Sequence, residues 1–377
     1  MTPTVLFGRH PHATSLMGRS YVACSKLIQI MKITEKITNT DHEKVFFGRD
    51  PESGYTGIIA IHSTVLGPAV GGTRYWNYPN EEAALTDALR LSRGMTYKNA
   101  VAGVPLGGGK SIILANQATD REAILRAHGR FVEALKGSYV TAEDVGTSPA
   151  DMEIVRLETN HVAGLLGQSG DPSPKTARGV FRAMQASLRY LRDSDNLSGL
   201  TIALQGCGHV GFHLAKMLHD AGAKLIVSDV NERSVSRVVD EFAAQRIAPE
   251  EIFEVSADIF APCALGGVLN DETIPRFKVQ IVAGAANNQL LEERHGEILR
   301  ENKILYAPDY VANVGGVFNG CTELLGWEPE RAQKKIDEIY DTILTIYESA
   351  NAEGISTNKA ADRLAESRLR SADPRRQ

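Results

Sequence analysis

The sequence of 377 residues has few of the features that mark secreted, membrane or nucleic-acid-binding proteins. Its four cysteines stand far apart and form no C-x-x-C pair, so neither disulfides nor a zinc or other metal site is predicted, and a reducing cytoplasm fits. No apolar run approaches the ~18 residues that a membrane span needs. A net charge of −5 gives no basic excess, so nucleic acid is not an expected partner.

Acidic residues are missing from the first 34 positions, which do contain Arg, Lys, Ser and Thr. A transit peptide has this composition. The alternatives are a disordered tail or a start codon placed too early, because Met31 opens a more regular segment. We expect residues 1–31 to be a disordered tail outside the folded part.

The length exceeds that of one ordinary hydrophobic core, which predicts two domains. A Gly/Ser/Pro-rich stretch at 164–174 is the best candidate linker. We therefore expect a mixed α/β domain over 32–165, to which helices at about 329–370 return, and a second domain over 172–328. Alternating strands and helices in the second domain predict a parallel sheet covered on both faces.

Helix start signals are clear in the first domain. Asn80 and Asp120 precede amphipathic runs, and Ser148 precedes a proline at the first helical position. Strands are expected at 45–66, 111–114 and 139–142. Near the C-terminus, one long helix is expected over Pro329–Ala352, and Thr357 is expected to cap the last helix.

Two lysines, Lys98 and Lys110, lie twelve residues apart, and the second follows three glycines. Glycines are expected where something approaches the backbone closely, and we expect a small substrate between the two ammonium groups. A lysine shielded from water beside another cation has a lowered pKa and can act as a base. The other lysine would stay charged and hold a carboxylate, and Asp144, at a strand end, could face the same cleft.

A dinucleotide fingerprint lies in the second domain. An apolar strand ends in a G-x-G-x-x-G turn that opens a helix, and Asp229 lies 18 residues beyond the last glycine. The first glycine makes the tight turn, the second admits the pyrophosphate, and the third lets helix and strand pack closely. An acid at Asp229 would bind the adenosine ribose and repel a 2′-phosphate, which favours NAD over NADP. The turn is Gly206, Cys207, Gly208, His209, Val210 and Gly211.

Several longer motifs resemble the glutamate/leucine/phenylalanine/valine dehydrogenase superfamily, most nearly its leucine dehydrogenases. The resemblance covers roughly residues 35–370. It implies two domains with a cleft between them, a homo-oligomer built through the first domain, and NAD-dependent reversible oxidative deamination of an L-amino acid. The motifs are Gly71–Arg74, Gly94–Lys98, Gly107–Lys110, Thr141–Thr147, Ala261–Gly267, Ala286–Gln289 and Ala307–Val311.

The same resemblance implies roles for individual residues. Lys98 matches the lysine that binds the substrate α-carboxylate, and Lys110 matches the general base that activates water. Asp144 matches the aspartate that moves protons to and from the amino nitrogen. Gly72 and Met95 match residues that line the substrate cleft. Thr176 and Asn287 match residues near the nicotinamide end of the cofactor.

Side-chain specificity is expected to follow the polarity of the pocket. Glutamate enzymes of the superfamily carry a lysine where this chain has Val70, which cannot neutralise a buried carboxylate. Ala142 fits an apolar wall. The other wall reads Asn313–Gly320 and includes Val317, and Gly320 replaces a branched residue of leucine enzymes. A branched-chain amino acid is thus the preferred substrate and phenylalanine the alternative.

A different class remains open, namely an NAD-binding sensor that kept the fold and lost catalysis. Retention of Lys98, Lys110 and Asp144 together argues for a working enzyme. A third alternative is an amino-acid dehydrogenase with an arginine pocket or a preference for NADP. Val70 argues against the arginine pocket, and Asp229 argues against NADP.

Overall fold

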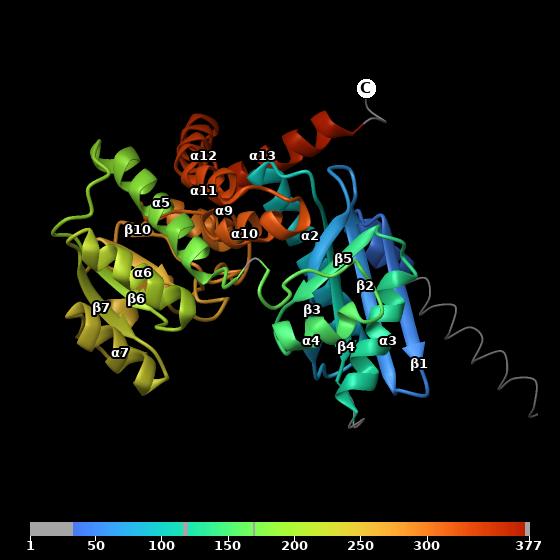
Figure 1. The fold of residues 1–377 in the computed structure, drawn as a ribbon. Coiled ribbons are helices and arrows are strands. Elements are labelled where there is room, and N and C mark those ends of the chain that lie inside the picture. The colour runs from blue at the N-terminus through green and yellow to red at the C-terminus, as the bar shows by residue number, and fades with distance from the viewer. Residues whose placement is uncertain (1–32, 116–119, 169, 374–377) are drawn as a thin grey trace, which may run out of the picture.

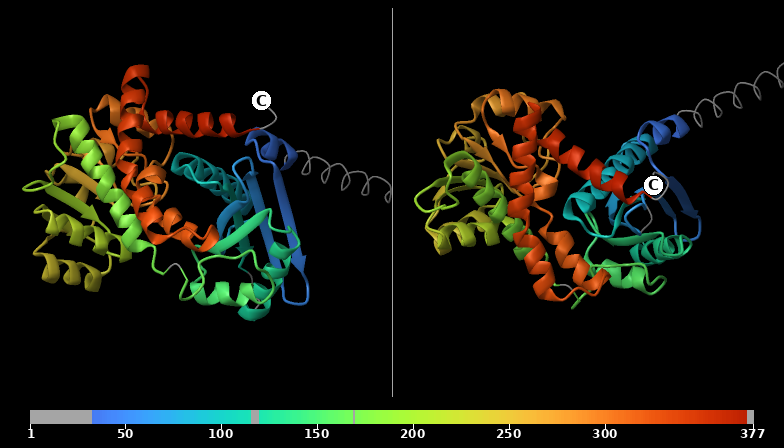
Figure 2. Two further views of the ribbon diagram at one scale, coloured as in Figure 1. Left: turned by 45° about the horizontal axis from the view of Figure 1, so that its top comes forward. Right: turned by 90° about the horizontal axis from the view of Figure 1, so that it is seen from above.

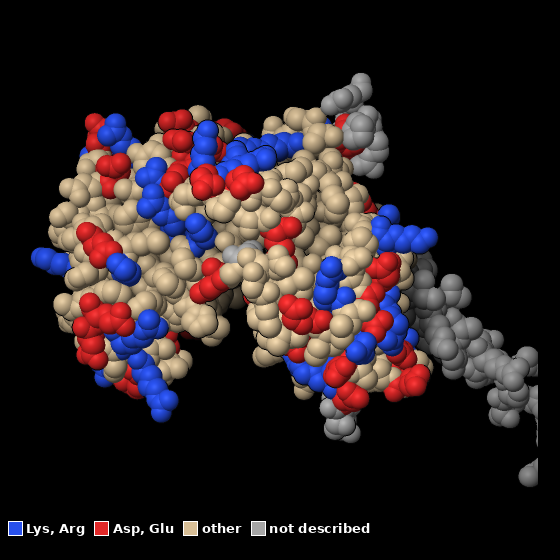
Figure 3. Space-filling view, in the orientation of Figure 1, with Lys and Arg blue, Asp and Glu red and all other residues tan. Residues whose placement is uncertain are grey.

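The structure is a computed structural model that describes residues 33–115, 120–168 and 170–373, so the predicted tail over 1–31 lies outside the described residues. Two α/β domains lie side by side, with a group of helices at their junction (Figure 1). In the space-filling view the surface is hollowed between the two lobes (Figure 3).

The first domain is a mixed sheet with the strand order β1-β2-β4-β3-β5 among the described residues. The pairs β1–β2 and β2–β4 are antiparallel, whereas β3 is parallel to both β4 and β5. Its elements are β1 (Lys44–Asp50), β2 (Tyr55–Ser63), β3 (Ala69–Trp76), α2 (Glu81–Ala102), β4 (Gly107–Leu114), α3 (Arg121–Glu133), β5 (Tyr139–Glu143) and α4 (Pro149–Arg156).

Alternation along β2 divides the core of this domain between two faces. Ile58 and Ala60 pack with the α2 side chains Leu85 and Leu89, while Ile59 on the other face packs with residues around α3 and β5. The period of two in a strand and of 3.6 in a helix explains this division. Helix α2 therefore covers the sheet face on which the predicted site lies.

The predicted helix starts of the first domain are confirmed. The side chains of Asn80 and Asp120 accept hydrogen bonds from the amides of Ala83 and Ala123. Ser148 forms a reciprocal capping box with Asp151. Each such cap stabilises its helix by about 1 kcal/mol.

The second domain is a parallel sheet with the strand order β11-β10-β9-β6-β7-β8 among the described residues. Counted from β6, this is the 3-2-1-4-5-6 order of dinucleotide-binding folds, whose ligands bind where the strand order reverses, here between β6 and β9. Its elements are α5 (Ser173–Arg192), β6 (Thr201–Gln205), α6 (His209–Asp220), β7 (Lys224–Ser228), α7 (Glu232–Phe242), β8 (Gln245–Arg246), η1 (Ile252–Glu254), β9 (Ile259–Pro262), η2 (Ile274–Arg276), β10 (Ile281–Val282), α8 (Arg294–Glu301) and β11 (Leu305–Tyr306).

The remaining helices join the two domains. The last of them, α13, runs from the helical group across to the first domain (Figure 2). There the Arg368 guanidinium donates to the carbonyl oxygens of Ala100 and Val101 at the end of α2. These helices are α9 (Asp309–Ala312), α10 (Gly315–Leu324), α11 (Pro329–Asp337), α12 (Ile339–Glu353) and α13 (Thr357–Ala372).

Two predictions about these helices are wrong. The expected single helix over Pro329–Ala352 is divided into α11 and α12 at Glu338. Thr357 does not cap the last helix: it is the first helical residue, and its hydroxyl donates to the Tyr306 carbonyl. The Thr357 hydroxyl thus bonds to β11 instead of to the helix N-terminus, a contact that sequence spacing alone could not indicate.

Candidate active site

Three neighbouring strands place the predicted reactive groups on one sheet face. The register pairs Gly72 of β3 with Ala142 of β5, and the register between β3 and β4 puts Gly72 beside Lys110. Because paired residues point to the same face, the lysine, the glycine and the alanine form one row. Asp144 follows two residues after Ala142 and lies over the same face.

Lys110 and Asp144 form an ion pair at the end of this row. The Lys110 Nζ lies 2.8 Å from the Asp144 Oδ2, and Lys110 is only 5% exposed. Burial lowers the pKa of Lys110, and the carboxylate beside it opposes part of that shift. The structure thus brings Lys110 and Asp144 together, and the direction of the Lys110 pKa shift agrees with the expectation from the sequence. The catalytic roles of the two residues stay predictions.

Gly72 makes this pair possible by having no side chain. A Cβ at this position would lie 2.4 Å from the Glu143 carbonyl oxygen and 2.7 Å from the Asp144 Cβ. Those distances are far below van der Waals contact, so any other residue would push Asp144 away from Lys110.

The three glycines before Lys110 have a role that differs from the predicted one. They belong to β4, and the atoms that approach them belong to the protein itself. A Cβ on Gly108 would lie 2.1 Å from the Thr96 amide nitrogen, and a Cβ on Gly109 would lie 2.7 Å from the Tyr139 ring. The glycines let α2 and the Tyr139 ring, which comes from β5 on the far side of β3, pack against β4. This packing brings α2, which carries Lys98, next to the strand that carries Lys110.

Lys98 reaches from α2 toward the second domain. Its Nζ lies 3.4 Å from the Asn287 Oδ1, which also accepts a hydrogen bond of 2.8 Å from the side-chain Nδ2 of Asn313. Burial lowers the pKa of Lys98 to about 8, with the Asp309 carboxylate opposing the shift and Lys110 adding to it. Because this pKa lies above 7, the ammonium form predominates at pH 7, which agrees with the expectation that Lys98 stays charged.

The predicted pocket residues lie on both sides of this region. Val70 is buried on the same strand face as Gly72, and Met95 lies half-buried on α2. Val317 and Gly320 are three residues apart on α10 and so share a face. A Cβ on Gly320 would meet no atom within 4 Å, so this position adjoins open space.

α10 is tied to both domains. A Cβ at Gly316 would lie 3.0 Å from the Thr176 hydroxyl at the start of α5. At its other end the Glu323 carboxylate accepts hydrogen bonds from the amides of Gly164 and Leu165, at 3.1 and 3.4 Å. The helix that carries the predicted pocket wall therefore touches the predicted linker.

The glycine turn has the shape that a dinucleotide requires. Gly206 has φ +100°, and a Cβ on Gly211 would lie 1.9 Å from the Gly206 carbonyl oxygen, so both must be glycine. The position of a Cβ on Gly208, by contrast, is open. No side chain of the described residues caps α6 at this end, so its first amides can receive a phosphate.

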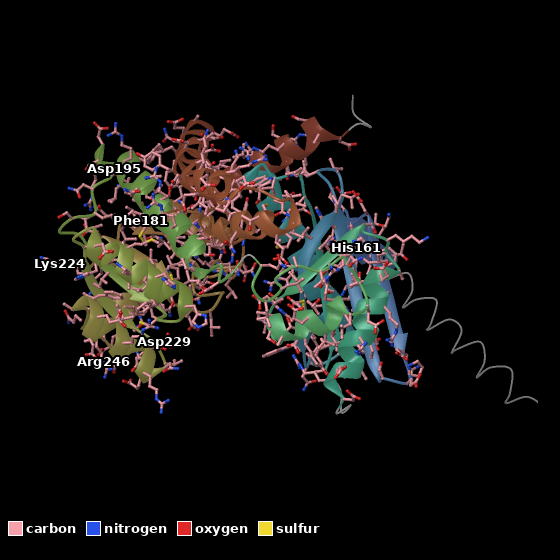
Figure 4. All side chains as sticks on the ribbon, viewed as in Figure 1. His161, Phe181, Asp195, Lys224, Asp229 and Arg246 are labelled. Carbon is pink, nitrogen blue, oxygen red and sulfur yellow. The ribbon has the colours of Figure 1, made fainter. Side chains whose placement is uncertain are left out.

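Asp229 lies beside this turn. Its carboxylate accepts hydrogen bonds from the Cys207 amide at 2.7 Å and the Asn231 amide at 2.8 Å. Figure 4 labels Lys224 and Asp229 at the two ends of β7, with Asp229 at the end nearer the first domain in that view. The residues of the turn and of this strand end thus fit a nicotinamide dinucleotide.

Comparison with known proteins decides the family. The profile described as Glu/Leu/Phe/Val dehydrogenase, dimerisation domain, matches residues 42–161, and that described as Glutamate/Leucine/Phenylalanine/Valine dehydrogenase matches residues 229–376. Leucine dehydrogenase of Bacillus cereus is 53% identical over 345 residues, which cover 90% of this chain and 94% of the relative. The chain belongs to the Glu/Leu/Phe/Val dehydrogenase family. It is thus an amino-acid dehydrogenase, an oxidoreductase, as its motifs indicate.

Other members of the Glu/Leu/Phe/Val dehydrogenase family differ in their named substrates. The L-tryptophan dehydrogenase of Nostoc punctiforme is 48% identical over 342 residues, covering 90% of this chain and 96% of the relative. A crystal structure of that enzyme superposes with a TM-score of 0.81 at 46% identity, covering 90% of this chain and 99% of the other. The family fixes the type of enzyme and leaves the preferred amino acid open.

Three charged or polar residues of this family member were not predicted as site residues. Arg74 binds Asp144, Asp309 lies near Lys98, and Asn313 binds Asn287. All three lie in or next to motifs that resemble the family. Those motifs were the signal in the sequence that could have identified them. Within the described residues, no helix is long and apolar enough to cross a membrane, and no group of three or more His, Cys, Asp or Glu side chains could hold a metal ion.

Proposed function

We propose that this enzyme catalyses the NAD-dependent, reversible oxidative deamination of an apolar L-amino acid, with a branched side chain preferred. The amino acid, NAD⁺ and water give the 2-oxo acid, ammonium, NADH and a proton. The observation that carries the proposal is the ion pair of the buried Lys110 with Asp144, 2.8 Å apart beside Gly72, with Lys98 nearby at the junction of the domains. The proposal includes the domain division expected from the sequence. Residues 32–165, joined by the helices at about 329–370, form the first domain, and residues 172–328 form the second.

Each residue of the site has one task in this proposal. The Lys98 ammonium holds the substrate carboxylate, and Asp144 takes a proton from the amino nitrogen. Lys110, whose pKa burial lowers, takes a proton from the water that attacks the imino carbon. When bound, NAD⁺ would supply the acceptor for the hydride of the substrate Cα. The residues that would hold it are Thr176, the turn Gly206–Gly211, Asp229 and Asn287.

NAD rather than NADP is part of the proposal and rests on Asp229. Substituting Asp229→Ser removes the carboxylate that would bind the ribose hydroxyls and repel a 2′-phosphate. We expect the KM for NAD⁺ to rise about tenfold, the equivalent of one charged hydrogen bond, and the ratio of NADP⁺ to NAD⁺ activity to increase. Steady-state kinetics with both cofactors measures this, and an unchanged ratio would remove Asp229 from the role.

The preferred side chain is the second part of the proposal. An apolar wall at Val70 and Ala142 disfavours a carboxylate side chain, because burying a charge without a partner is costly. The open space at Gly320 favours phenylalanine as the alternative substrate. Initial rates of NADH formation with leucine, isoleucine, valine, phenylalanine and glutamate test the order. A preference for glutamate would contradict it.

Gly320→Val gives a sharper test of the pocket. The valine side chain would enter the open space next to Val317 and shorten the pocket, so we expect kcat/KM for phenylalanine to fall about tenfold relative to leucine. A methylene in an apolar pocket discriminates by about 1–3 kcal/mol. The ratio of kcat/KM for phenylalanine to kcat/KM for leucine is measured on one enzyme preparation, so it does not depend on the fraction of active enzyme. An unchanged ratio would place Gly320 outside the pocket.

A homo-oligomer assembled through the first domain, working in a reducing cytoplasm, completes the proposal. The family profile over residues 42–161 is that of a dimerisation domain, and the wide cysteine spacing supports the compartment. A non-catalytic NAD-binding sensor is the competing class. The presence of Lys98, Lys110 and Asp144 together supports the enzyme instead.

A further inference from the structure

Asp144 has a second cationic partner besides Lys110. The Nε of Arg74 donates to the Asp144 Oδ2 at 2.9 Å, and the same oxygen receives Lys110. One carboxylate oxygen therefore bridges a lysine and an arginine. The Arg74 side chain is 21% exposed and that of Asp144 24%, so the contact is largely shielded from water.

Arg74 also binds a second carboxylate, that of Asp87. Its Nη1 donates to the Asp87 Oδ2 on α2 at 2.8 Å, and the Tyr78 hydroxyl donates to the same oxygen at 2.5 Å. Arg74 thus spans two carboxylates from different elements with two different nitrogens. A guanidinium can do this because its donors form a rigid planar fork, whereas a lysine offers one point charge.

Charge alternates along this row of side chains, in the order Lys110, Asp144, Arg74 and Asp87. If Lys110 gives up its proton during turnover, Asp144 loses its other close cation. Arg74 does not lose its proton in proteins, so it stays as a permanent partner. Burial raises the pKa of Asp144, but Lys110 and Arg74 together bring it below its ordinary value.

Arg74 also acts on Lys110. After burial and the opposing effect of Asp144, the positive charge of Arg74 is a further cause of the lowered Lys110 pKa, which Asp87 opposes. The other charged or titratable groups coupled to this pair are Lys98 from α2 and Glu143 and Tyr139 from β5. Of these groups, Arg74 binds the Asp144 carboxylate directly, at the same Oδ2 atom that receives Lys110.

We propose that Arg74 is a positioning residue of the reaction, which holds the Asp144 carboxylate against Lys110 and remains its cationic partner while Lys110 exchanges its proton. The proposal rests on the proposed function, in which Lys110 and Asp144 move protons. It predicts a defect in kcat and in its pH dependence, with the binding of NAD⁺ unaffected.

The test compares Arg74→Gln and Arg74→Lys with Arg90→Gln. Arg90 binds the same Asp87, at 3.2 Å, but its side chain is 59% exposed, so Arg90→Gln controls for loss of an arginine next to Asp87. The quantity measured is kcat for deamination from pH 6 to about pH 11, a range that covers the ordinary lysine pKa. NAD⁺ binding and thermal unfolding report on the fold of each variant.

For Arg74→Gln we expect kcat to fall at least tenfold and the rise of kcat with pH to move about one unit higher, because loss of a nearby positive charge raises the pKa of Lys110. Arg74→Lys should keep the wild-type pH dependence and still lose kcat, since it cannot bind both carboxylates. Arg90→Gln should behave as wild type.

Wild-type kcat and pH dependence in a folded Arg74→Gln would overturn the proposal. If that variant does not fold, Arg74→Lys decides, and full activity there would overturn it. Either result leaves the proposed function standing as long as the wild-type protein is active. A wild-type protein that binds NAD⁺ and turns over no amino acid would instead overturn the proposed function.

Discussion

Lys110→Ala is expected to lower kcat about 10³-fold while the protein still folds and binds NAD⁺. A positioned general base contributes about 10²–10⁴-fold to rate, and the lysine ammonium is the buried partner of Asp144. Removing it does not leave the carboxylate unpaired, because Arg74 remains at 2.9 Å. Stopped-flow and steady-state NADH formation measure the loss.

Lys110→Arg separates the charge of this residue from its ability to take a proton. Arginine keeps a positive charge beside Asp144 but does not deprotonate in proteins. We expect Lys110→Arg to be nearly as inactive as Lys110→Ala. High activity in the arginine variant would mean that position 110 supplies charge only, and near wild-type activity in the alanine variant would remove it from catalysis.

Lys98→Ala is expected to raise the KM for the amino acid and the 2-oxo acid about 100-fold with a smaller effect on kcat. A hydrogen bond to a charged group contributes about 1.5–3 kcal/mol, which corresponds to a factor of about 10–150. Lys98→Arg keeps the charge and is the matched control, expected to recover part of the affinity. A KM within twofold of wild type in Lys98→Ala would contradict the carboxylate-binding role.

The pH dependence of substrate binding tests the same residue without a mutation. The Lys98 pKa of about 8 means that the binding ammonium form predominates below that pH and is lost above it. The KM for the 2-oxo acid should therefore be nearly constant at lower pH and rise about tenfold per unit once the pH exceeds 8. The 2-oxo acid is used because it has no amino group of its own to titrate.

Local signals were enough to predict much of the fold. The caps at Asn80 and Ser148 and the glycine turn at 206–211 depend on neighbouring residues, and the structure has them where the sequence indicates. The Lys110–Asp144 pair was also predictable, since each residue lies in or beside a recognisable motif at a strand. β3 was missed because Gly71 and Gly72 interrupt the strand pattern, and β8 was missed because a strand of two residues has no pattern.

Features that depend on distant contacts could not be read from the sequence. Arg74 reaches Asp144 only because β3 lies between β4 and β5 in the sheet. The close packing at Gly108 and Gly109 requires α2 and the Tyr139 ring of β5 to lie against β4. The contact between Lys98 and Asn287 depends on how the domains meet. Each of these is set by strand register or domain placement.

The stoichiometry of the reaction tests the central claim most directly. The wild-type protein is incubated with NAD⁺ and L-leucine, and NADH, ammonium and the 2-oxo acid are quantified in the same sample. The proposed function predicts that all three form in equal amounts, and that NADH is consumed when 2-oxo acid and ammonium are supplied instead. Binding of NAD⁺ without formation of any of the three, across the panel of L-amino acids, would contradict it.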